Sequence, residues 1–483
     1  MKIAVAKGDG IGPEIMDAVV MIFNANKVAL EYEIVDMGKW VFDKGFSNGM
    51  TPEAQQAIEN LGILFKGPME TPKGKGVKSI NVTARKTWNT YANKRVFQTL
   101  HGVETVFSKA GIPIDITIVR ENIEDTYGGI EHMLTHDVAL SRRFITRPGS
   151  MQLIKYAFEM ARQKKARRIT CAHKANIMKL TDGLFLDIFY EVARDYPELK
   201  ADDKIVDDLA MKLVVRPDEF DVIVLTNLQG DIMSDLCAGL VGGLGFAPSA
   251  NIGDHISIFE AVHGTAPDIA GKNIANPTAL LLSGVTMLYH LGLTENAAVI
   301  ENALLYTLEQ GVHTGDFGDK KIPSVNTTQF AQAVISNFGK KPEQGAKEVM
   351  ANKPGTPTPF KLEHNAMMVS KEESNEVIAG VDMFIESSEQ PEVIAQKCQH
   401  HGGNKFNLIS ISNRGTQVWP TGSRYTNLIN LYNVRFESKA DQPLTQLDII
   451  GLYVTLCVDF KICSFELLNI WDGKKVYSLA QGQ

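Results

Sequence analysis

Hydrophobic positions over the first 338 residues follow two alternating patterns. Short runs rich in β-branched residues are bounded by polar residues and predict strands, as in KIAVA (2–6), ITIVR (116–120), RRITCAH (167–173) and DVIVLTN (221–227). Longer segments, such as 148–165 and 276–291, carry apolar residues at helical spacing and predict helices. This alternation of strands and helices is typical of an α/β fold.

The pattern changes near Lys340. Residues 341–360 are rich in Pro, Gly and Lys, which is typical of a linker. The chain beyond it contains strand-like runs such as NLYNVRFES (430–438) and an apolar helix candidate at 447–460. We therefore expect a domain over residues 1–340, a linker over 341–360 and a small α+β domain over 361–483.

Composition limits the classes of partner. A chain of 483 residues with 44% hydrophobic and 22% charged residues is expected to form two or three soluble globular units. The net charge of −7 argues against nucleic acid as the main partner. The longest apolar stretch, 279–293, is too short and too polar to span a membrane. Five cysteines without a C-x-x-C motif, and no signal-peptide pattern, lead us to expect a cytoplasmic protein.

The glycine turn GDGIGP (8–13) resembles a dinucleotide-binding fingerprint only at first sight. The Rossmann motif G-x-G-x-x-G needs its third glycine where this chain has Pro13. Proline suits the first turn of a helix, and Glu14 favours the positive helix end. We interpret this segment as a structural connection between a strand and a helix.

Arginines and hydrogen-bonding residues gather in two later segments. Ser79, Asn81, Arg85 and Arg95 fall within 66–95, and Arg120 and Tyr127 follow in RENIEDTYGG (120–129). Guanidinium groups bind carboxylates bidentately, so three converging arginines would suit a small polyanion. For each arginine alone, a solvated surface position or an ion pair is the simpler interpretation.

Two aspartates point to a metal. Asp231 and Asp235 are four residues apart, which places both carboxylates on one face of a helix. A divalent cation such as magnesium would relieve their repulsion, although solvated helix carboxylates are the simpler alternative. Lys179, in the apolar segment HKANIMK, is a candidate acid or base, with a helix-surface lysine as the default interpretation.

Taken together, these stretches resemble one family. GDGIGPEI, KGPMETPKGKGVKSIN with YANKR, RENIEDTYGGIE, HKANIMK, NLQGDIMSD and HGTAPDIAGKNIANP are similar to the isocitrate/isopropylmalate dehydrogenases, metal-dependent β-decarboxylating enzymes. The resemblance covers about 340 residues in order and implies a non-Rossmann, isopropylmalate-dehydrogenase-like fold. It implies a large subdomain (about 1–90 and 242–340) and a small subdomain (about 91–241) with a dimer clasp near 125–150. The tail resembles the C-terminal extension of some bacterial isocitrate dehydrogenases.

Within this family, Ser79 and Asn81 indicate isocitrate, because isopropylmalate enzymes present apolar side chains at these positions. The resemblance implies oxidative decarboxylation of isocitrate to 2-oxoglutarate and CO₂, with Mg²⁺ or Mn²⁺ as the metal. It also implies a homodimer in which Lys179 and Asp207 reach into the partner's site. The implied roles are isocitrate binding by Ser79, Asn81, Arg85, Arg95 and Arg120, metal binding by Asp207, Asp231 and Asp235, deprotonation of the hydroxyl by Lys179, and protonation of the enol by Tyr127.

The resemblance also places the nucleotide on the HGTAP loop, through Thr71, His263, Gly264, Thr265, Ala266, Asp268, Ile269 and Asn276. NADP-using relatives carry Lys-Tyr after this loop, whereas this chain has Asp268 and Ile269. A carboxylate accepts hydrogen bonds from ribose hydroxyls and repels a 2′-phosphate. We therefore predict NAD as the cofactor, with NADP as the alternative, which Lys272, Lys320 and Lys321 could favour.

Two other functions stay open from the sequence. One is a related dehydrogenase acting on isopropylmalate, homoisocitrate or tartrate, which Ser79 and Asn81 disfavour. The other is a non-catalytic regulatory subunit, which the full set of catalytic residue types disfavours.

Overall fold

The computed structural model describes residues 1–71, 79–355, 375–422, 425–439 and 443–479. The chain divides into two compact units, one made from residues 1–128 and 144–368 and the other from residues 129–143 and 369–483. Each unit has its own sheet and its own apolar core. Residues 356–374, which include part of the expected linker, lie outside the described residues.

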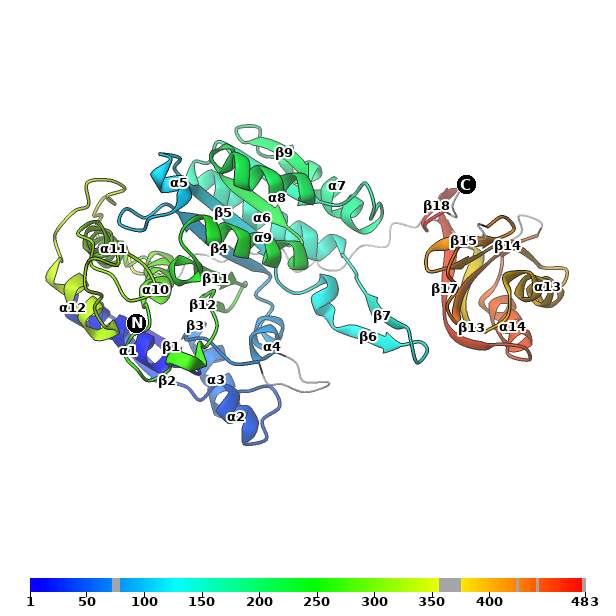
Figure 1. Cartoon of the computed structure of the whole chain (residues 1–483), viewed down its shortest axis with the longest axis horizontal. Helices are drawn as coiled ribbons and strands as arrows, with labels where there is room; N and C mark the ends of the chain where they lie inside the picture. The colour runs from blue at the N-terminus through cyan, green and yellow to red at the C-terminus, as the bar shows by residue number, and fades with distance from the viewer. Residues whose placement is uncertain (72–78, 356–374, 423–424, 440–442, 480–483) are drawn as a thin grey trace. The chain divides into compact units, whose positions relative to one another are not determined.

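The first unit is built on a sheet of ten strands (Figure 1). Its order is β2-β1-β3-β12-β11-β4-β5-β10-β8-β9. The strands are β1 (Lys2–Ala6), β2 (Glu31–Ile34), β3 (Ile63–Lys66), β4 (Ala92–Gln98), β5 (Asp115–Glu121), β8 (Arg168–His173), β9 (Lys200–Ile205), β10 (Val222–Leu225), β11 (Pro248–Ile252) and β12 (Ser257–Ala261). Two parallel blocks are joined by antiparallel pairing of β11 with β12, β11 with β4, and β4 with β5.

Helices cover both faces of this sheet, which explains the uninterrupted apolar runs in the sequence. On β1, Ile3 and Val5 belong to one core cluster, and Ala4 and Ala6 to another on the opposite face. Figure 1 shows α10 beside β11 and β12, and α9 beside β4 and β5. The helices are α1 (Gly12–Ala25), α2 (Lys39–Asp43), α3 (Pro52–Leu61), α4 (Ile80–Thr87), α5 (Val106–Lys109), α6 (Arg147–Lys164), α7 (Thr181–Ala193), α8 (Val206–Val215), α9 (Asn227–Leu240), α10 (Thr278–His290), α11 (Thr294–Glu309) and α12 (Thr327–Ser336). The α/β prediction is confirmed.

The second unit combines a hairpin from the middle of the chain with the C-terminal sheet. The hairpin is β6 (Ile130–Met133) and β7 (Ala139–Arg142). The six-stranded sheet has the order β15-β14-β16-β13-β17-β18. Its elements are β13 (Glu376–Glu386), α13 (Pro391–Gly402), β14 (Phe406–Asn413), β15 (Thr416–Trp419), β16 (Leu431–Ser438), α14 (Gln446–Leu456), β17 (Lys461–Trp471) and β18 (Lys474–Lys475). Thr135 in the hairpin donates a hydrogen bond to Asn430, and Arg142 pairs with Glu466 at 2.7 Å.

Residues after α12 lie against α11. Backbone amides of Glu343 and Gln344 donate to the Glu309 carboxylate, and Lys347 and Asn302 exchange two hydrogen bonds of 2.7 and 2.9 Å. Lys353 N donates to Gly292 O at 2.8 Å. The segment 343–353 is therefore fixed to the first unit by paired backbone groups.

Across the described ranges, the helices are too short or too polar to cross a membrane.

Candidate active site

Two buried arginines, one on β4 and one on β5, converge on one carboxylate of α9. Arg120 donates through Nε and Nη2 to Asn227 Oδ1, at 3.0 and 2.7 Å, and its Nη1 contacts Asp231. Arg95 bonds Asn93 and Ser234 and lies 3.6 Å from Asp231 Oδ1. The predicted residues Arg95, Arg120 and Asp231 thus form one cluster.

The start of α9 is adapted to this close packing. Thr226 occupies the N-cap position after β10, and Asn227 begins the helix. A Cβ atom added to Gly230 would lie 2.6 Å from Arg120 Cγ, so only glycine lets the Arg120 stem approach the helix backbone. Asp125, held in the left-handed region with φ +66°, accepts a hydrogen bond from Leu228 N. These contacts fix α9 against the segment that carries Tyr127.

Tyr127 joins the cluster through its hydroxyl group. Its OH donates to Asp231 Oδ2 at 2.7 Å, and the Arg120 guanidinium lies 4.9 Å from its ring centroid. Burial would raise the pKa of Asp231, but Arg120, the Tyr127 hydroxyl and Arg95 together hold it below the ordinary value. Burial and the hydrogen bond to Asp231 raise the pKa of Tyr127, so the phenol keeps its proton at neutral pH.

The predicted metal ligands are only partly brought together. Asp235 lies one helical turn after Asp231, 3.7 Å from Arg95, and burial raises the pKa of its carboxyl. Asp207 lies at the start of α8, where it contacts Lys174, which keeps the pKa of Asp207 low. Within the described ranges no three His, Cys, Asp or Glu side chains are arranged to hold a metal ion. Asp231 and Asp235 alone supply the one or two carboxylates that magnesium takes from a protein, so the pair fits that ion.

The lysines of HKANIMK are placed differently from one another. Lys174 contacts Asp207 and is partly buried, whereas Lys179 is exposed and has no interaction with another described residue. The structure therefore brings Lys174, and not Lys179, to one of the predicted metal ligands. The sequence reasoning missed Lys174, although it lies in the same motif.

A second buried network holds the predicted substrate residues of α4. Glu260, 4% exposed, contacts Lys66 and accepts from Arg85 Nη2 at 3.0 Å and from Asn251 at 2.8 Å. Lys66, 1% exposed, donates to Asn81 Oδ1 at 2.9 Å. Burial lowers the pKa of Lys66, while Lys66 and Arg85 hold the pKa of Glu260 far below its usual range against the effect of burial. Sequence reasoning missed both Lys66 and Glu260, which no local motif links.

The predicted nucleotide residues lie on three loops of the first unit. Thr71 Oγ1 donates to Ser79 Oγ at 3.2 Å, which joins the loop to the start of α4. His263 is half-buried, desolvation lowers its pKa, and its Nε2 has no partner among the described residues. Asn276 donates to Asp316 at 3.1 Å. Gly264, Ala266 and Asp268 are exposed, and Thr265 and Ile269 are half-buried.

The GDGIGP turn packs under this loop. Ile11 N donates to Thr265 O at 2.9 Å, and a Cβ added to Gly10 would lie 2.1 Å from the same oxygen. Gly10 is thus required for the approach of two backbones, in agreement with a structural role for the turn.

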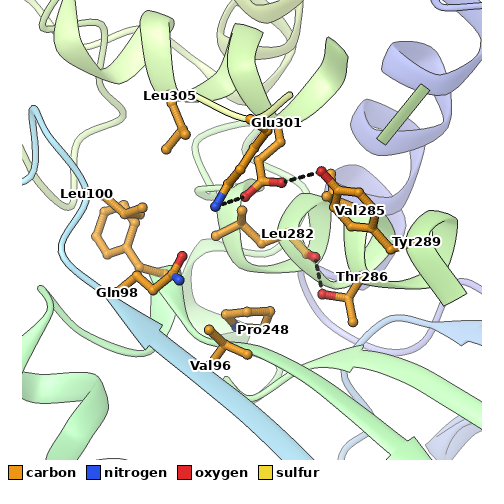
Figure 2. A pocket seen from close by; sticks show the side chains of 12 residues that line it. Val96, Gln98, Leu100, Pro248, Leu282, Val285, Thr286, Tyr289, Glu301 and Leu305 are labelled. Carbon is orange, nitrogen blue, oxygen red and sulfur yellow. Dashed lines mark hydrogen bonds and ion pairs between the residues drawn. The ribbon is translucent and has the colours of Figure 1, made fainter. Parts of the chain in front are cut away.

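A separate cavity lies on the opposite face of β4 and β11. Because side chains alternate along a strand, Val96 and Gln98 line this cavity while Arg95 faces the arginine cluster. Figure 2 shows its apolar wall and, at one end, Glu301 beside the Tyr289 hydroxyl (3.1 Å). Glu301 also pairs with Lys347 Nζ at 3.3 Å. The polar groups at that end are therefore already paired.

Comparison with known proteins identifies relatives along the whole chain. Residues 2–334 match the family model described as isocitrate/isopropylmalate dehydrogenase, and residues 376–483 match that of the bacterial isocitrate dehydrogenase C-terminal domain. The chain is 43% identical to an isocitrate dehydrogenase [NADP] of Thermus thermophilus, over 100% of this chain and 96% of that protein. It is 39% identical to an isocitrate dehydrogenase [NADP] of Rickettsia bellii, over 100% and 99%. The crystal structure of the TT0538 protein from Thermus thermophilus superposes with a TM-score of 0.93, at 42% identity over 100% and 96%.

The full-length relatives correct one prediction. They are named as NADP enzymes, so the NAD prediction drawn from Asp268 and Ile269 is wrong. Asp268 lies exposed on the short turn Pro267–Ile269, where water and salt screen its charge. One exposed carboxylate is therefore a poor guide to the charge that a whole binding site offers a 2′-phosphate.

Proposed function

Because the chain belongs to the isocitrate/isopropylmalate dehydrogenase family, we propose that it oxidises and decarboxylates isocitrate to 2-oxoglutarate and CO₂ with reduction of NADP. The observation that carries the proposal is the cluster of Arg95, Arg120 and Tyr127 around Asp231. Buried guanidinium groups beside a carboxylate suit a substrate with several carboxylates near a metal.

Residues of α4, β4 and β5 would bind the substrate. Arg85, Arg95 and Arg120 would hold the carboxylates, and Ser79 and Asn81 at the start of α4 would bind the one that isopropylmalate lacks. Arg85 Nε is buried without a partner among the described residues, so it has a donor to offer. Desolvation and the neighbouring Arg120 and Arg85 lower the pKa of Arg95 to about 9, which supports a site that takes an anion.

Two side chains are suited to proton transfer. Tyr127 keeps its proton, since burial and Asp231 raise its pKa, and it can deliver this proton to the enol carbon. A lysine of HKANIMK would remove the hydroxyl proton. Lys179 was the sequence-based candidate, but contact with Asp207 makes Lys174 the better placed amine.

Asp231 and Asp235, with Asp207, would hold Mg²⁺ or Mn²⁺. When bound, the ion supplies Lewis-acid stabilisation of negative charge on the substrate oxygens. The loops with Thr71, His263–Ile269 and Asn276 would hold NADP, which supplies the hydride acceptor.

We further propose a homodimer whose sites share residues. Large apolar side chains are exposed on α8 and α9, among them Met211 (56%), Val215 (61%) and Ile232 (55%). Burial of such a face against a second copy would remove apolar area from water. We also propose domains over residues 1–340 and 361–483. The first domain would consist of a large subdomain, made from 1–90 and 242–340, and a small subdomain, 91–241. We propose a cytoplasmic location, which the absence of a disulfide bond among the five cysteines, all within the described ranges, supports.

Steady-state kinetics with NADP and Mg²⁺ test this function. We expect kcat/KM for isocitrate to exceed that for isopropylmalate by about 10⁴-fold, because buried polar groups reject a substrate that cannot pair with them. Asp231→Asn and treatment with a chelator should each abolish turnover, whereas Asp208→Asn, a half-buried carboxylate on α8 that pairs with Lys212, should leave it unchanged. Comparable turnover of isopropylmalate, or full activity after chelation, would contradict the proposal.

A further inference from the structure

Among the described residues of the C-terminal unit, helices cover one face of the sheet and leave the other face uncovered. Val434 and Phe436 on β16 pack with residues of α13 and α14 in the apolar core, and Figure 1 shows both helices on the same side of β13 and β17. Because side chains alternate along a strand, Asn433 and Arg435 point to the other face. This face is polar where β14, β15 and β16 meet.

A cavity of about 190 Å³ lies on this polar face. Its polar lining comes from Ser410, Ser412, Gln417, Asn433, Arg435 and Ser478. The volume exceeds what a single water molecule needs, and the lining offers hydroxyl and amide groups in one place. The cavity therefore has the size and the polar groups of a small-molecule site.

The charged member of the lining is already neutralised. Arg435 donates through Nε and Nη2 to the Asp382 carboxylate, both at 2.7 Å, and through Nη1 to Ser478 O at 2.7 Å. Its remaining surroundings include the Tyr477 ring, 5.4 Å from the guanidinium carbon. An ionic ligand would find no uncompensated charge here, so a neutral ligand fits better.

Gln417 already donates to Thr421, and Ser478 O accepts from Arg435, but three other polar side chains of the lining are available. Asn433 Oδ1 is buried and has no hydrogen-bond partner in the described ranges. The hydroxyl groups of Ser410, itself 7% exposed, and Ser412 make no hydrogen bond with another described residue. A buried acceptor without a donor is costly, and a ligand that supplies an N–H group would remove this cost.

We propose that this cavity binds a small neutral ligand with a primary carboxamide group. Its N–H donates to Asn433 Oδ1, and its carbonyl accepts from the Ser412 hydroxyl. A primary amide is the simplest neutral group that offers a donor and an acceptor side by side, matching the asparagine amide opposite it. This site is separate from the arginine cluster and independent of the proposed reaction.

The test uses the full-length chain and ligand-observed NMR, with propionamide as the probe. We expect saturable binding of propionamide. The affinity for N,N-dimethylpropionamide, which has no N–H to donate, should be lower by at least about tenfold. Asn433→Ala should remove binding, and Ser412→Ala should weaken it. Asn407→Ala, a change at an exposed position of neighbouring β14, should leave it unchanged.

Two further readouts separate a ligand site from a structural role. Because Asn433 Oδ1 has no described partner, Asn433→Ala should not lower the melting temperature, and isocitrate turnover should be unaffected by either variant. Absence of saturation, equal binding of the dimethylated amide or of glycerol, or unchanged propionamide binding in Asn433→Ala would each overturn the proposal. If Asn433→Ala fails to fold, unchanged binding in Ser412→Ala overturns it.

Discussion

Replacement of Glu260 by glutamine tests the buried network that holds α4. Glu260 faces two cations, Lys66 and Arg85, and it is the carboxylate that neutralises them. Glu260→Gln keeps the size of the side chain and its hydrogen bond from Asn251, but removes the negative charge. The change leaves a lysine that is 1% exposed beside an arginine with no counter-charge.

The expected loss in the free energy of unfolding follows from the burial of both Glu260 and Lys66. Removal of one partner from a buried ion pair costs about 3–5 kcal/mol, because the remaining charge loses its compensation. A loss of about 4 kcal/mol corresponds to a change of roughly 10³ in the unfolding equilibrium. Burial already lowers the pKa of Lys66, so deprotonation of this amine in the variant would bring the loss toward the lower value.

The sign of the pH dependence is also fixed. Burial alone would raise the pKa of Glu260, but Lys66 and Arg85 depress it below the value of an unfolded chain. The stabilisation is therefore fully present above the unfolded pKa of about 4.3 and is lost as the pH falls toward the folded-state pKa. The difference between wild type and variant should be constant from about pH 6 to 8 and should shrink below about pH 4.

Urea denaturation followed by circular dichroism measures the difference. Lys66→Met with Glu260→Gln should lose less stability than the sum of the two single changes, because the two charges share one interaction. Glu33→Gln, which breaks the exposed Lys2–Glu33 pair, serves as the control and should shift the midpoint far less. Equal midpoint shifts for Glu260→Gln and Glu33→Gln would refute the reasoning.

Three other changes have defined outcomes. Tyr127→Phe should lower overall turnover about 10²–10⁴-fold yet preserve the reduction of oxalosuccinate, which is measured as NADPH consumption. An equal loss in both assays would contradict a role confined to protonation. Lys174→Met should lower turnover about 10²-fold or more while Lys179→Met has little effect, since the structure brings only Lys174 to Asp207; the reverse order in steady-state kinetics would favour Lys179. A chain ending at Gly355 should stay folded. A chain ending at Gly345 loses the hydrogen bonds of Lys347 and Lys353, so its melting temperature in calorimetry should be several degrees lower. Identical melting temperatures of the two chains would contradict this expectation.

The sequence by itself determined features that depend on local spacing. The alternating strand and helix patterns indicated the α/β class, and Pro13 excluded a Rossmann turn, because backbone conformation is limited by the residues at the turn itself. The spacing of Asp231 and Asp235 placed both carboxylates on one helix face, since a helix repeats every 3.6 residues. The order of motifs was sufficient to identify the family.

Only the tertiary structure decided which distant groups meet. Lys66 and Glu260 are 194 residues apart, and they pair because β3 and β12 are neighbours in the sheet. Folding alone also brings Lys174 to Asp207, and the hairpin 130–142 to the C-terminal strands. The cofactor prediction failed for this reason, because Asp268 was judged alone, whereas the charge at a binding site sums over loops that the chain brings together only when it folds.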